Sequence, residues 1–336
     1  MHIDRLISSL EETADPGFSA DWDQSGIQIA GTKETIRTIA VTLDPSQAAI
    51  QSALKEKADF ILTHHPLALS PRRPDQADEY SAVLRRVLSS GSWLYAAHTS
   101  LDTRTSGPVS WLARALGLKG ILPIDPLAPL PGLKFTLRGF QADEALFQAL
   151  GALQERPVFS FANEILDIVV PRQQHMQIRR ILRQFAREAQ AEVTETSLLK
   201  PDCGYGVVGE LNPAVPADEF LGQLHKVLGK RQLISTGACP DLFATVAYCP
   251  GSGMTLARKA FALGADIFIS GDLKFHQAQE IETLGLTLDV GHFTLEETMM
   301  AVWADELKSR LAQDIRVHFI PGRDPLSITR LTNSES

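Results

Sequence analysis

The sequence predicts an α/β fold with two α/β halves, largely parallel in their sheets, and a small α+β domain inserted between them. Three observations carry this prediction. With 336 residues, the chain is too long for one small hydrophobic core. Strand and helix patterns alternate near both ends of the chain, which is typical of crossover connections in parallel sheets. In the middle the order of elements changes, which indicates a separate domain.

The first half alternates strand and helix patterns after an amphipathic N-terminal helix. That helix is predicted from Ile3, Leu6, Ile7 and Leu10, which share one face, and it has no signal-peptide pattern. Strands are predicted at 35–46 (ending at Asp44), 59–66 and 92–103, and helices at 46–58, 79–91 and 108–118. The block closes near Gly120.

The middle region begins with a proline-rich segment, 127–133, that is predicted as a linker. Strands are then predicted at 133–140, twice within 157–171, and at 191–199, with helices at 142–153 and 177–190. This β-α-β-β-α-β order is the split ferredoxin-like arrangement. The second helix carries one apolar stripe, and its arginines, Arg172, Arg179, Arg183 and Arg187, lie largely elsewhere. They form either a solvated face or a polyanion-binding face.

The alternating pattern returns after about Cys203. Helices are predicted at 217–229, 254–264, 274–285 and 295–311, and strands at 242–253, 265–272, 286–292 and 315–325. The predicted domains are therefore 1–126 and 203–336 as the two α/β halves and 127–202 as the insert.

Composition and charge argue against several classes of protein. The formal net charge of −8 disfavours attachment to nucleic acid or to an anionic membrane by charge alone, although a local basic face is compatible with it. No run approaches the ~20 apolar residues of a membrane span. Three widely spaced cysteines, Cys203, Cys239 and Cys249, suit neither a disulfide framework nor a zinc-thiolate site. We expect reduced thiols in a cytoplasmic protein.

Polar residues gather where the predicted parallel strands end, at the edge of the sheet where ligands bind in such folds. The first half places His64, His65, His98, Thr99 and Asp102 there, and the second half Gly251, Ser252, Asp272, His276, Asp289, His292 and Glu296. Five of the nine histidines are in this set, whereas structural histidines would be scattered. The pattern predicts a site.

The adjacent pair His64 and His65 is its most informative part. Successive residues of a strand point to opposite faces, so both can reach one site only where the strand ends, and Pro66 favours that. Two neighbouring metal ions, one per histidine, fit this geometry better than one ion. Thr294 and Glu297 predict a capping box that places His292 just before a helix and Glu296 in its first turn. Imidazole and carboxylate ligands suit Zn, Fe, Mn or Ni.

Five segments together resemble one family: "WDQSGIQIAG", "ILTHHPL", "AAHTSLDT", "FISGDLKFHQAQE" and "DVGHFTLEE". They resemble the dinuclear-metal-centre hexameric protein family, also called GTP cyclohydrolase 1 type 2 homologues or Nif-three-like proteins. The resemblance covers about residues 1–125 and 203–325. It implies two interlinked α/β domains, a toroidal homohexamer with paired divalent ions facing inward, and, in larger members, an inserted ferredoxin-like domain.

The resemblance also implies roles for individual residues. The family's metal ligands fall on His64, His65, Asp102, His292 and Glu296, the five that strand-end reasoning selects. His98, Asp272 and His276 match motif positions near the metals, and we expect them to orient ligands or move protons during catalysis. The chain departs from the family pattern at Ser100 and at Ser110, which bears on substrate choice more than on metal binding.

Two functions follow as expectations. The first is a metal-dependent hydrolase, GTP cyclohydrolase-like by resemblance, that uses metal-activated water on a nucleotide or another phosphorylated small molecule. The segment "CPGSG", 249–253, would seat a phosphate or form a tight turn. The alternative is a non-enzymatic hexamer that stores or delivers metal or serves as a scaffold for protein or nucleic acid.

Overall fold

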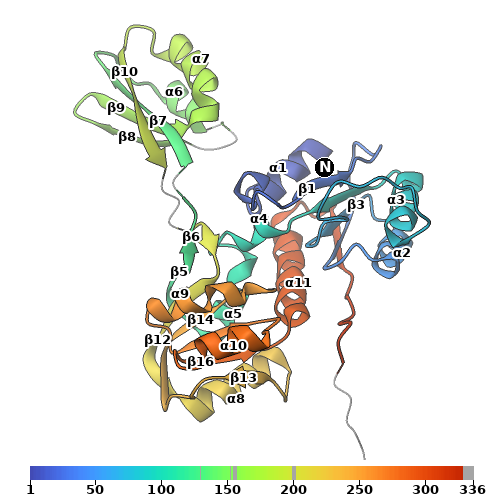
Figure 1. Cartoon of the computed structure of the whole chain (residues 1–336). Coiled ribbons are helices and arrows are strands. Elements are labelled where there is room, and N and C mark those ends of the chain that lie inside the picture. The colour runs from blue at the N-terminus through green and yellow to red at the C-terminus, as the bar shows by residue number, and fades with distance from the viewer. Residues whose placement is uncertain (129, 152, 154–156, 199–201, 328–336) are drawn as a thin grey trace, which may run out of the picture. The chain divides into compact units, whose positions relative to one another are not determined.

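The computed structural model describes residues 1–128, 130–151, 153, 157–198 and 202–327. The chain divides into two compact units (Figure 1). The main unit comprises Met1–Pro126 and Asp202–Ser336, and the middle unit Leu127–Pro201. Each unit has its own hydrophobic core.

The first sheet of the main unit has five strands in the order β1-β4-β3-β2-β17. These are β1 (Gly26–Ile29), β2 (Thr38–Thr42), β3 (Phe60–Thr63), β4 (Trp93–Ala96) and β17 (Arg316–Phe319). All neighbours are parallel except β1 and β4. Strand β17 comes from the far end of the sequence, so residues near both ends of the chain share this sheet. The helices α1 (Ile3–Glu11) and η1 (Pro16–Phe18) precede β1, and α2 (Gln47–Lys55) and α3 (Glu79–Ser90) lie in the connections β2–β3 and β3–β4.

The second sheet has six strands in the order β13-β16-β15-β14-β12-β5. These are β5 (Lys119–Leu122), β12 (Val207–Pro216), β13 (Ile234–Thr236), β14 (Leu242–Tyr248), β15 (Ile267–Ser270) and β16 (Leu286–Asp289). Only β14, β15 and β16 are parallel to one another; β5, β12 and β13 pair antiparallel. The sequence patterns predicted the parallel centre and missed these three antiparallel strands.

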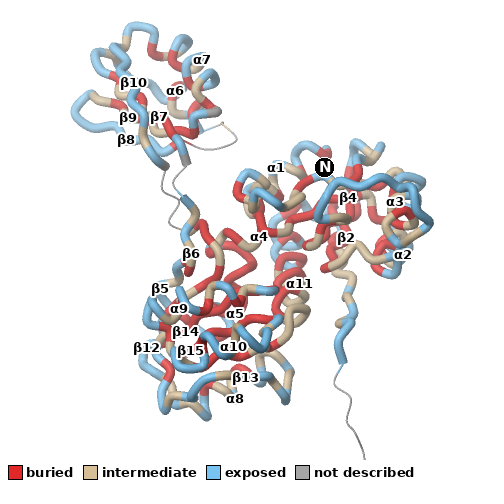
Figure 2. The backbone as a smooth tube through the Cα atoms, in the orientation of Figure 1, coloured by how far each residue is buried: buried red, intermediate tan, exposed pale blue. Residues whose placement is uncertain are grey.

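The main unit contains further helices, of which the last, α11 (His292–Arg310), contributes most clearly to a core shared by both sheets. These helices are α4 (Thr99–Asp102), η2 (Pro108–Ser110), α5 (Trp111–Leu116), α8 (Ala217–Leu228), η4 (Gly253–Leu256), α9 (Ala257–Ala262), α10 (Phe275–Ile281) and α11 (His292–Arg310). The inward face of α11, which includes Met299 and Trp303, belongs to a core shared by both sheets. Figure 2 shows the buried backbone along α11 and the central strands. A two-stranded ribbon, β6 (Asp125–Pro126) with β11 (Gly204–Tyr205), lies where the chain leaves and re-enters this unit.

The middle unit runs β7 (Leu130–Arg138), α6 (Glu144–Gly151), β8 (Val158–Ala162), β9 (Ile165–Pro171), η3 (Arg172–Gln174), α7 (His175–Phe185) and β10 (Gln190–Leu198). Its sheet is antiparallel throughout, in the order β10-β7-β9-β8. The segment expected as a linker, 127–133, already enters β7 at Leu130. Pairing of Pro131 with Ser197 and of Leu133 with both Glu195 and Val170 extends the strand into it.

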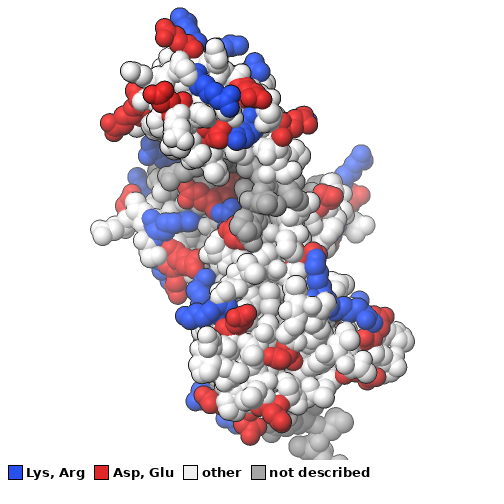
Figure 3. All heavy atoms as spheres, turned by 90° about the vertical axis from the view of Figure 1, so that its left-hand side faces the viewer, with Lys and Arg blue, Asp and Glu red and all other residues white. Residues whose placement is uncertain are grey.

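The surface carries both signs of charge. Figure 3 shows Lys and Arg interspersed with Asp and Glu on one face, without a continuous basic area. No helix within the described part of the chain is long and apolar enough to span a membrane.

Candidate metal centre

The site forms where strands and helices of the two sheets end. His64 and His65 directly follow β3, and His98 lies after the parallel neighbour β4, just before α4, which Asp102 ends. His292 and Glu296 lie at the start of α11, after β16. Parallel neighbours end at the same edge, and α11 packs against both halves of the main unit. Residues more than 200 positions apart in sequence therefore face one another.

The start of α11 differs from the prediction. Thr294 was expected to cap the helix, but the helix begins at His292 and its N-cap is Gly291, with no side-chain cap bond. Gly291 has a φ of 85°, which glycine adopts without strain, so no polar cap is needed to turn the chain. As a consequence, His292 and Glu296 are separated by one helical turn and share a face, with Nε2 2.8 Å from Oε2.

Four imidazole rings surround the two carboxylates. The ring centroid of His65 lies 5.1 Å from that of His64, 5.5 Å from that of His98 and 5.6 Å from that of His292. Oxygens of Glu296 lie 3.5 Å from His64 Nε2 and 3.2 Å from His65 Nε2, and Asp102 Oδ2 lies 3.8 Å from His64 Nε2.

Two groups of three donor atoms could each hold a metal ion. One group is His64, His65 and His98, and the other is His65, His292 and Glu296; within each, the donor atoms lie within 4.8 Å of one another. The groups share His65. The structure thus brings four of the five predicted ligands, His64, His65, His292 and Glu296, into these groups together with His98. Asp102 belongs to neither group, although its Oδ2 lies 3.8 Å from His64 Nε2.

Each of the four rings is held from behind by an oxygen acceptor. The Nδ1–H groups donate to Ala97 O (His64, 2.8 Å), Asp44 Oδ1 (His65, 2.6 Å), Asp23 Oδ1 (His98, 2.7 Å) and Asp272 Oδ2 (His292, 2.8 Å). Metal-binding histidines usually donate their second ring nitrogen to such an acceptor, which fixes the tautomer and the ring orientation. Once the rings are neutral, all four Nε2 atoms are thereby left as electron-pair donors.

Sequence reasoning missed Asp23 and Asp44 as holders of these rings. Asp44 lies just past the end of β2, so the strand-end rule that selected the histidines would also have selected it. Asp23 lies inside the "WDQSG" segment, and its side chain is completely buried. Its carboxylate also accepts from Gln24 N, from Ser25 Oγ and from the backbone and hydroxyl of Thr99. No strand pattern marks that position.

Buried polar atoms at the centre have no hydrogen-bond partner in the described part of the chain: His64 Nε2, Asp102 Oδ1 and Glu296 Oε2. The contacts of Glu296 Oε2 with two rings are close, but they lack hydrogen-bond geometry. A buried polar atom left without a partner costs about 1–3 kcal/mol. Cations bound at this centre would give such atoms partners, so the donor set fits a metal.

The pKa values show how strongly the groups interact in the metal-free chain. Burial alone would raise the pKa of Glu296, but the positive charge of His64 and the contact with His292 hold it well below its usual range. Burial would lower the pKa of His65, yet Asp44 and Glu296 raise it to about 10. Contact with Glu296 raises the pKa of His292 to about 9. Burial raises the pKa of Asp102.

Two glycines at the centre lie so close to Glu296 and His292 that a side chain would clash with these residues. A Cβ atom on Gly251 would lie 2.3 Å from Glu296 Oε1, and one on Gly271 would lie 2.5 Å from the backbone nitrogen of His292. Gly251 also has a φ of +64°. The "CPGSG" segment therefore lies against the centre, where Gly251 makes room for a ligand side chain; phosphate seating by this segment stays a prediction.

The remaining predicted residues differ in position. Asp272 lies in a turn with a φ of 60° and positions His292. His276 is exposed on α10, where its Nδ1 lies 3.3 Å from Gln279 Oε1, and it does not join the cluster within the described chain. A catalytic role for either residue stays a prediction.

Fold and site together define a class: an α/β protein in which two sheets end at a buried centre of histidines and carboxylates that could hold metal. A family model, Duf34/NIF3 (NGG1p interacting factor 3), matches residues 1–325, and the chain belongs to this family. The resemblance inferred from the sequence motifs is confirmed.

Relatives cover nearly the whole chain at low identity. A "GTP cyclohydrolase 1 type 2 homolog" of Staphylococcus epidermidis is 25% identical, over 88% of this chain and 90% of its own length. A "NIF3-like protein 1" of Bos taurus is 25% identical, over 98% and 93%. Among solved structures, a Bacillus cereus protein related to NIF3 matches with a TM-score of 0.81 at 21% identity, over 98% of this chain and 99% of the other. This last likeness shows the fold alone.

Proposed function

We propose that this protein is a metal-dependent hydrolase of a nucleotide or another phosphorylated small molecule. One observation carries the proposal: four histidines, each held at Nδ1 by an oxygen acceptor, present Nε2 to buried carboxylate atoms that lack hydrogen-bond partners in the described chain. A purely structural cluster would satisfy these atoms internally. The relatives' printed name, GTP cyclohydrolase 1 type 2 homolog, supports a nucleotide as the first substrate to test.

His64, His65, His292, Asp102 and Glu296 would hold two divalent ions. Two donor groups that share His65 support two ions rather than one. Nitrogen and carboxylate donors without thiolate suit Zn, Fe, Mn or Ni. When bound, such ions would lower the pKa of water and polarise a substrate oxygen.

The chain's own residues would supply orientation and proton transfer. Asp44, Asp272 and the Ala97 carbonyl fix the three ligand rings. His98, fixed by Asp23, would accept or release a proton at Nε2, which faces the centre and is partly open to solvent. His98→Ala should then abolish turnover while the protein keeps most of its metal, whereas loss of metal in this variant would make His98 a ligand.

Three further proposals concern the whole molecule. The middle unit is an inserted ferredoxin-like domain, supported by its element order and its strand order. The chain forms a homohexamer, as the motif resemblance implies. It acts in the cytoplasm, supported by cysteines that form no disulfide in the described residues.

The experiment is hydrolysis of GTP, other nucleotides and simple phosphate esters by protein carrying its metal, by chelator-treated protein and by metal-reconstituted protein. We expect turnover only with metal, and its loss in His65→Ala and Glu296→Gln. Activity that persists after these variants lose their metal would refute the hydrolase proposal. If no compound is turned over with any metal, the storage or scaffold function gains support.

A further inference from the structure

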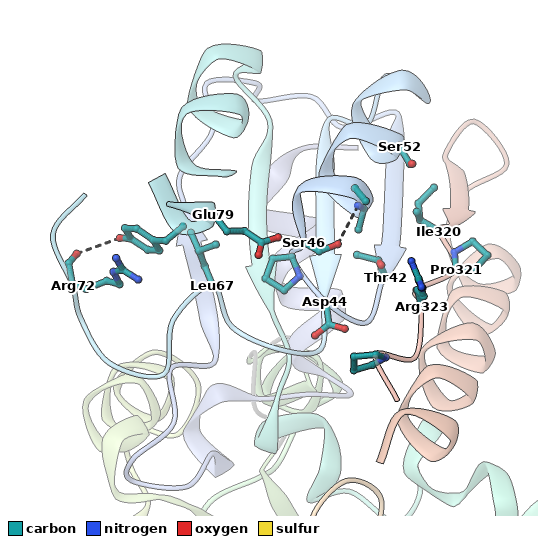
Figure 4. Close-up of a pocket in the computed structure, with 16 residues that line it drawn as sticks. Thr42, Asp44, Ser46, Ser52, Leu67, Arg72, Glu79, Ile320, Pro321 and Arg323 are labelled. Carbon is teal, nitrogen blue, oxygen red and sulfur yellow. Dashed lines mark hydrogen bonds between the residues drawn. The ribbon is translucent and has the colours of Figure 1, made fainter. Parts of the chain in front are cut away.

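A cavity of about 650 Å³ lies in the main unit, and its lining includes Asp44, the residue that holds the His65 ring (Figure 4). Its walls come from the end of β2, the start of α2, the segment after β3, the start of α3 and the segment after β17. The volume is within the ~300–1,000 Å³ range of small-molecule sites. Nothing in the proposed hydrolase reaction uses this cavity.

Two polar groups at one wall of the cavity are not used by the described chain, one of them directly beneath its surface. Thr42 is completely buried, and its hydroxyl has no hydrogen-bond partner among the described residues. Arg323 is exposed, lines the same wall and is in no ion pair with a described carboxylate. Figure 4 shows both side chains directed to the same part of the cavity. A hydroxyl and a guanidinium together form a donor pair for a phosphate or carboxylate group.

The acidic groups of the cavity are already engaged. Glu79 accepts the backbone N–H of Gln47 at the start of α2, at 3.1 Å, and Asp44 accepts from His65. The Ser46 hydroxyl accepts from Ala49 N, so part of the N-terminus of α2 is also satisfied by the chain. An anionic ligand group is therefore directed to Arg323 and Thr42.

The rest of the cavity suits a compact apolar or aromatic body. Leu67, Ile320 and three prolines line it, and the Tyr80 ring forms a wall that is backed by the Arg72 guanidinium, 4.5 Å from the ring centroid. Arg72 also pairs with Asp78, which holds it in place. A flat ligand would contact these surfaces while its charged end remains on the Arg323 side.

The segment Thr42–Asp44 forms both the cavity wall and the support of the histidine pair. The His64 N–H is shared between the carbonyls of Thr42 and Leu43 at 3.3 and 3.1 Å, and the His65 N–H donates to Leu43 O at 3.0 Å. Asp44 binds the His65 ring. A ligand that shifts this segment shifts both metal-side histidines, and the effect must be reciprocal between the two sites.

We propose that this cavity is a second small-molecule site, which binds an organic phosphate or carboxylate with a compact apolar or aromatic body and is coupled to the metal centre through Thr42–Asp44. The proposal goes beyond the hydrolase function and does not depend on it.

Calorimetric titration of the metal-containing protein with phenyl phosphate, benzoate and phenol tests the binding. We expect saturable binding of one or both anions and much weaker binding of phenol; the stronger anion identifies the ligand class. Arg323→Gln should weaken anion binding about tenfold or more, and the isosteric Thr42→Val several-fold. Arg86→Gln, an exposed arginine outside the cavity, is the matched control and should change nothing. Absence of saturable binding, or equal binding by all these variants, overturns the proposal.

A second arm separates this site from the metal centre. Glu296→Gln should lose metal but still bind the anion; binding that disappears with the metal places the anion on the ions and overturns the proposal. Saturating anion should change metal affinity at least threefold in the wild type and not in Asp44→Asn. If the cavity binds the anion but the protein hydrolyses none of the tested compounds, this inference stands and the hydrolase proposal fails.

Discussion

Substitution of Gly251 by alanine tests whether close backbone approach is required to hold Glu296 in the centre. The added Cβ would lie 2.3 Å from Glu296 Oε1 and 3.6 Å from His292 Cε1. Because Glu296 is buried and α11 is part of the core, the carboxylate can escape only by leaving its position among the histidines. The left-handed backbone costs about 1–2 kcal/mol for alanine, and overpacking adds about 1–3 kcal/mol.

Gly229→Ala is the matched control for this substitution. Its φ is +67°, close to the +64° of Gly251, and nothing lies within 4 Å of the new Cβ. The control should therefore lose only the backbone cost of about 1–2 kcal/mol and keep its metal.

Urea unfolding and metal titration measure the two effects. Tryptophan fluorescence reports on the main unit alone, because all four tryptophans lie outside residues 127–201. We expect Gly251→Ala to lose about 2–5 kcal/mol of unfolding free energy and about 10–100-fold in metal affinity. Equal metal affinity in the two alanine variants would refute the reasoning.

Three other predictions follow from the same geometry. Asp23→Asn should cost about 2 kcal/mol of unfolding free energy at pH 7, since the carboxylate accepts five bonds, including that from His98. Although burial opposes it, these bonds lower the pKa of Asp23 in the folded chain. The stabilisation by Asp23 is thus present above the ordinary carboxyl pKa near ~4 and is lost as the pH falls below it. In urea unfolding, the difference in unfolding free energy between wild type and Asp23→Asn should be constant from about pH 8 to 5 and should narrow below about pH 4. A difference that widens below about pH 4 would contradict the account. Metal binding to apo-protein at pH 7.5 should release at least one proton. The reason is that the pKa values of His65 and His292 are raised to about 10 and about 9, and both rings must lose a proton to bind metal. The calorimetric heat of metal binding should therefore depend on the ionisation enthalpy of the buffer, and identical heats in different buffers would count against proton release. Replacement of residues 127–201 by a short Gly/Ser linker should leave the main unit folded and able to bind metal. The reason is that Pro126 and Gly204 already pair with each other and the removed unit has its own core. A variant that is insoluble, or unfolded by circular dichroism, would refute the division into units.

Much of the centre could be predicted from the sequence because strand ends carry local signals. The apolar run 60–63 followed by His64 and His65 marks a strand end, and the parallel order of β3 and β4 brings His98 and Asp102 to the same edge. The structure places His64, His65, Asp102, His292 and Glu296 together. Hydrophobic periodicity and turn residues suffice to place each of these residues at the end of a strand or near the start of a helix, since these signals require no long-range pairing.

Other features depend on pairing that no local pattern shows. Strand β17, near the end of the sequence, pairs with β2, near its beginning. Strand β5, which follows β1 to β4 of the first sheet in sequence, pairs with β12 of the second sheet. The start of α11 was misassigned because Thr294 and Glu297 form a convincing capping-box pattern, yet Gly291 turns the chain three residues earlier. Asp23 could not be found because its role depends on tertiary contact with His98 rather than on its own neighbours in sequence.

The most direct test of the account is metal content combined with anomalous diffraction on protein prepared without chelators. The account predicts about two transition-metal ions per chain, bound by the Nε2 atoms of His64, His65 and His292 and by the carboxylates of Asp102 and Glu296, and their loss in His65→Ala. Protein that binds no ion after reconstitution, or that binds ions elsewhere and keeps them in His65→Ala, would contradict it.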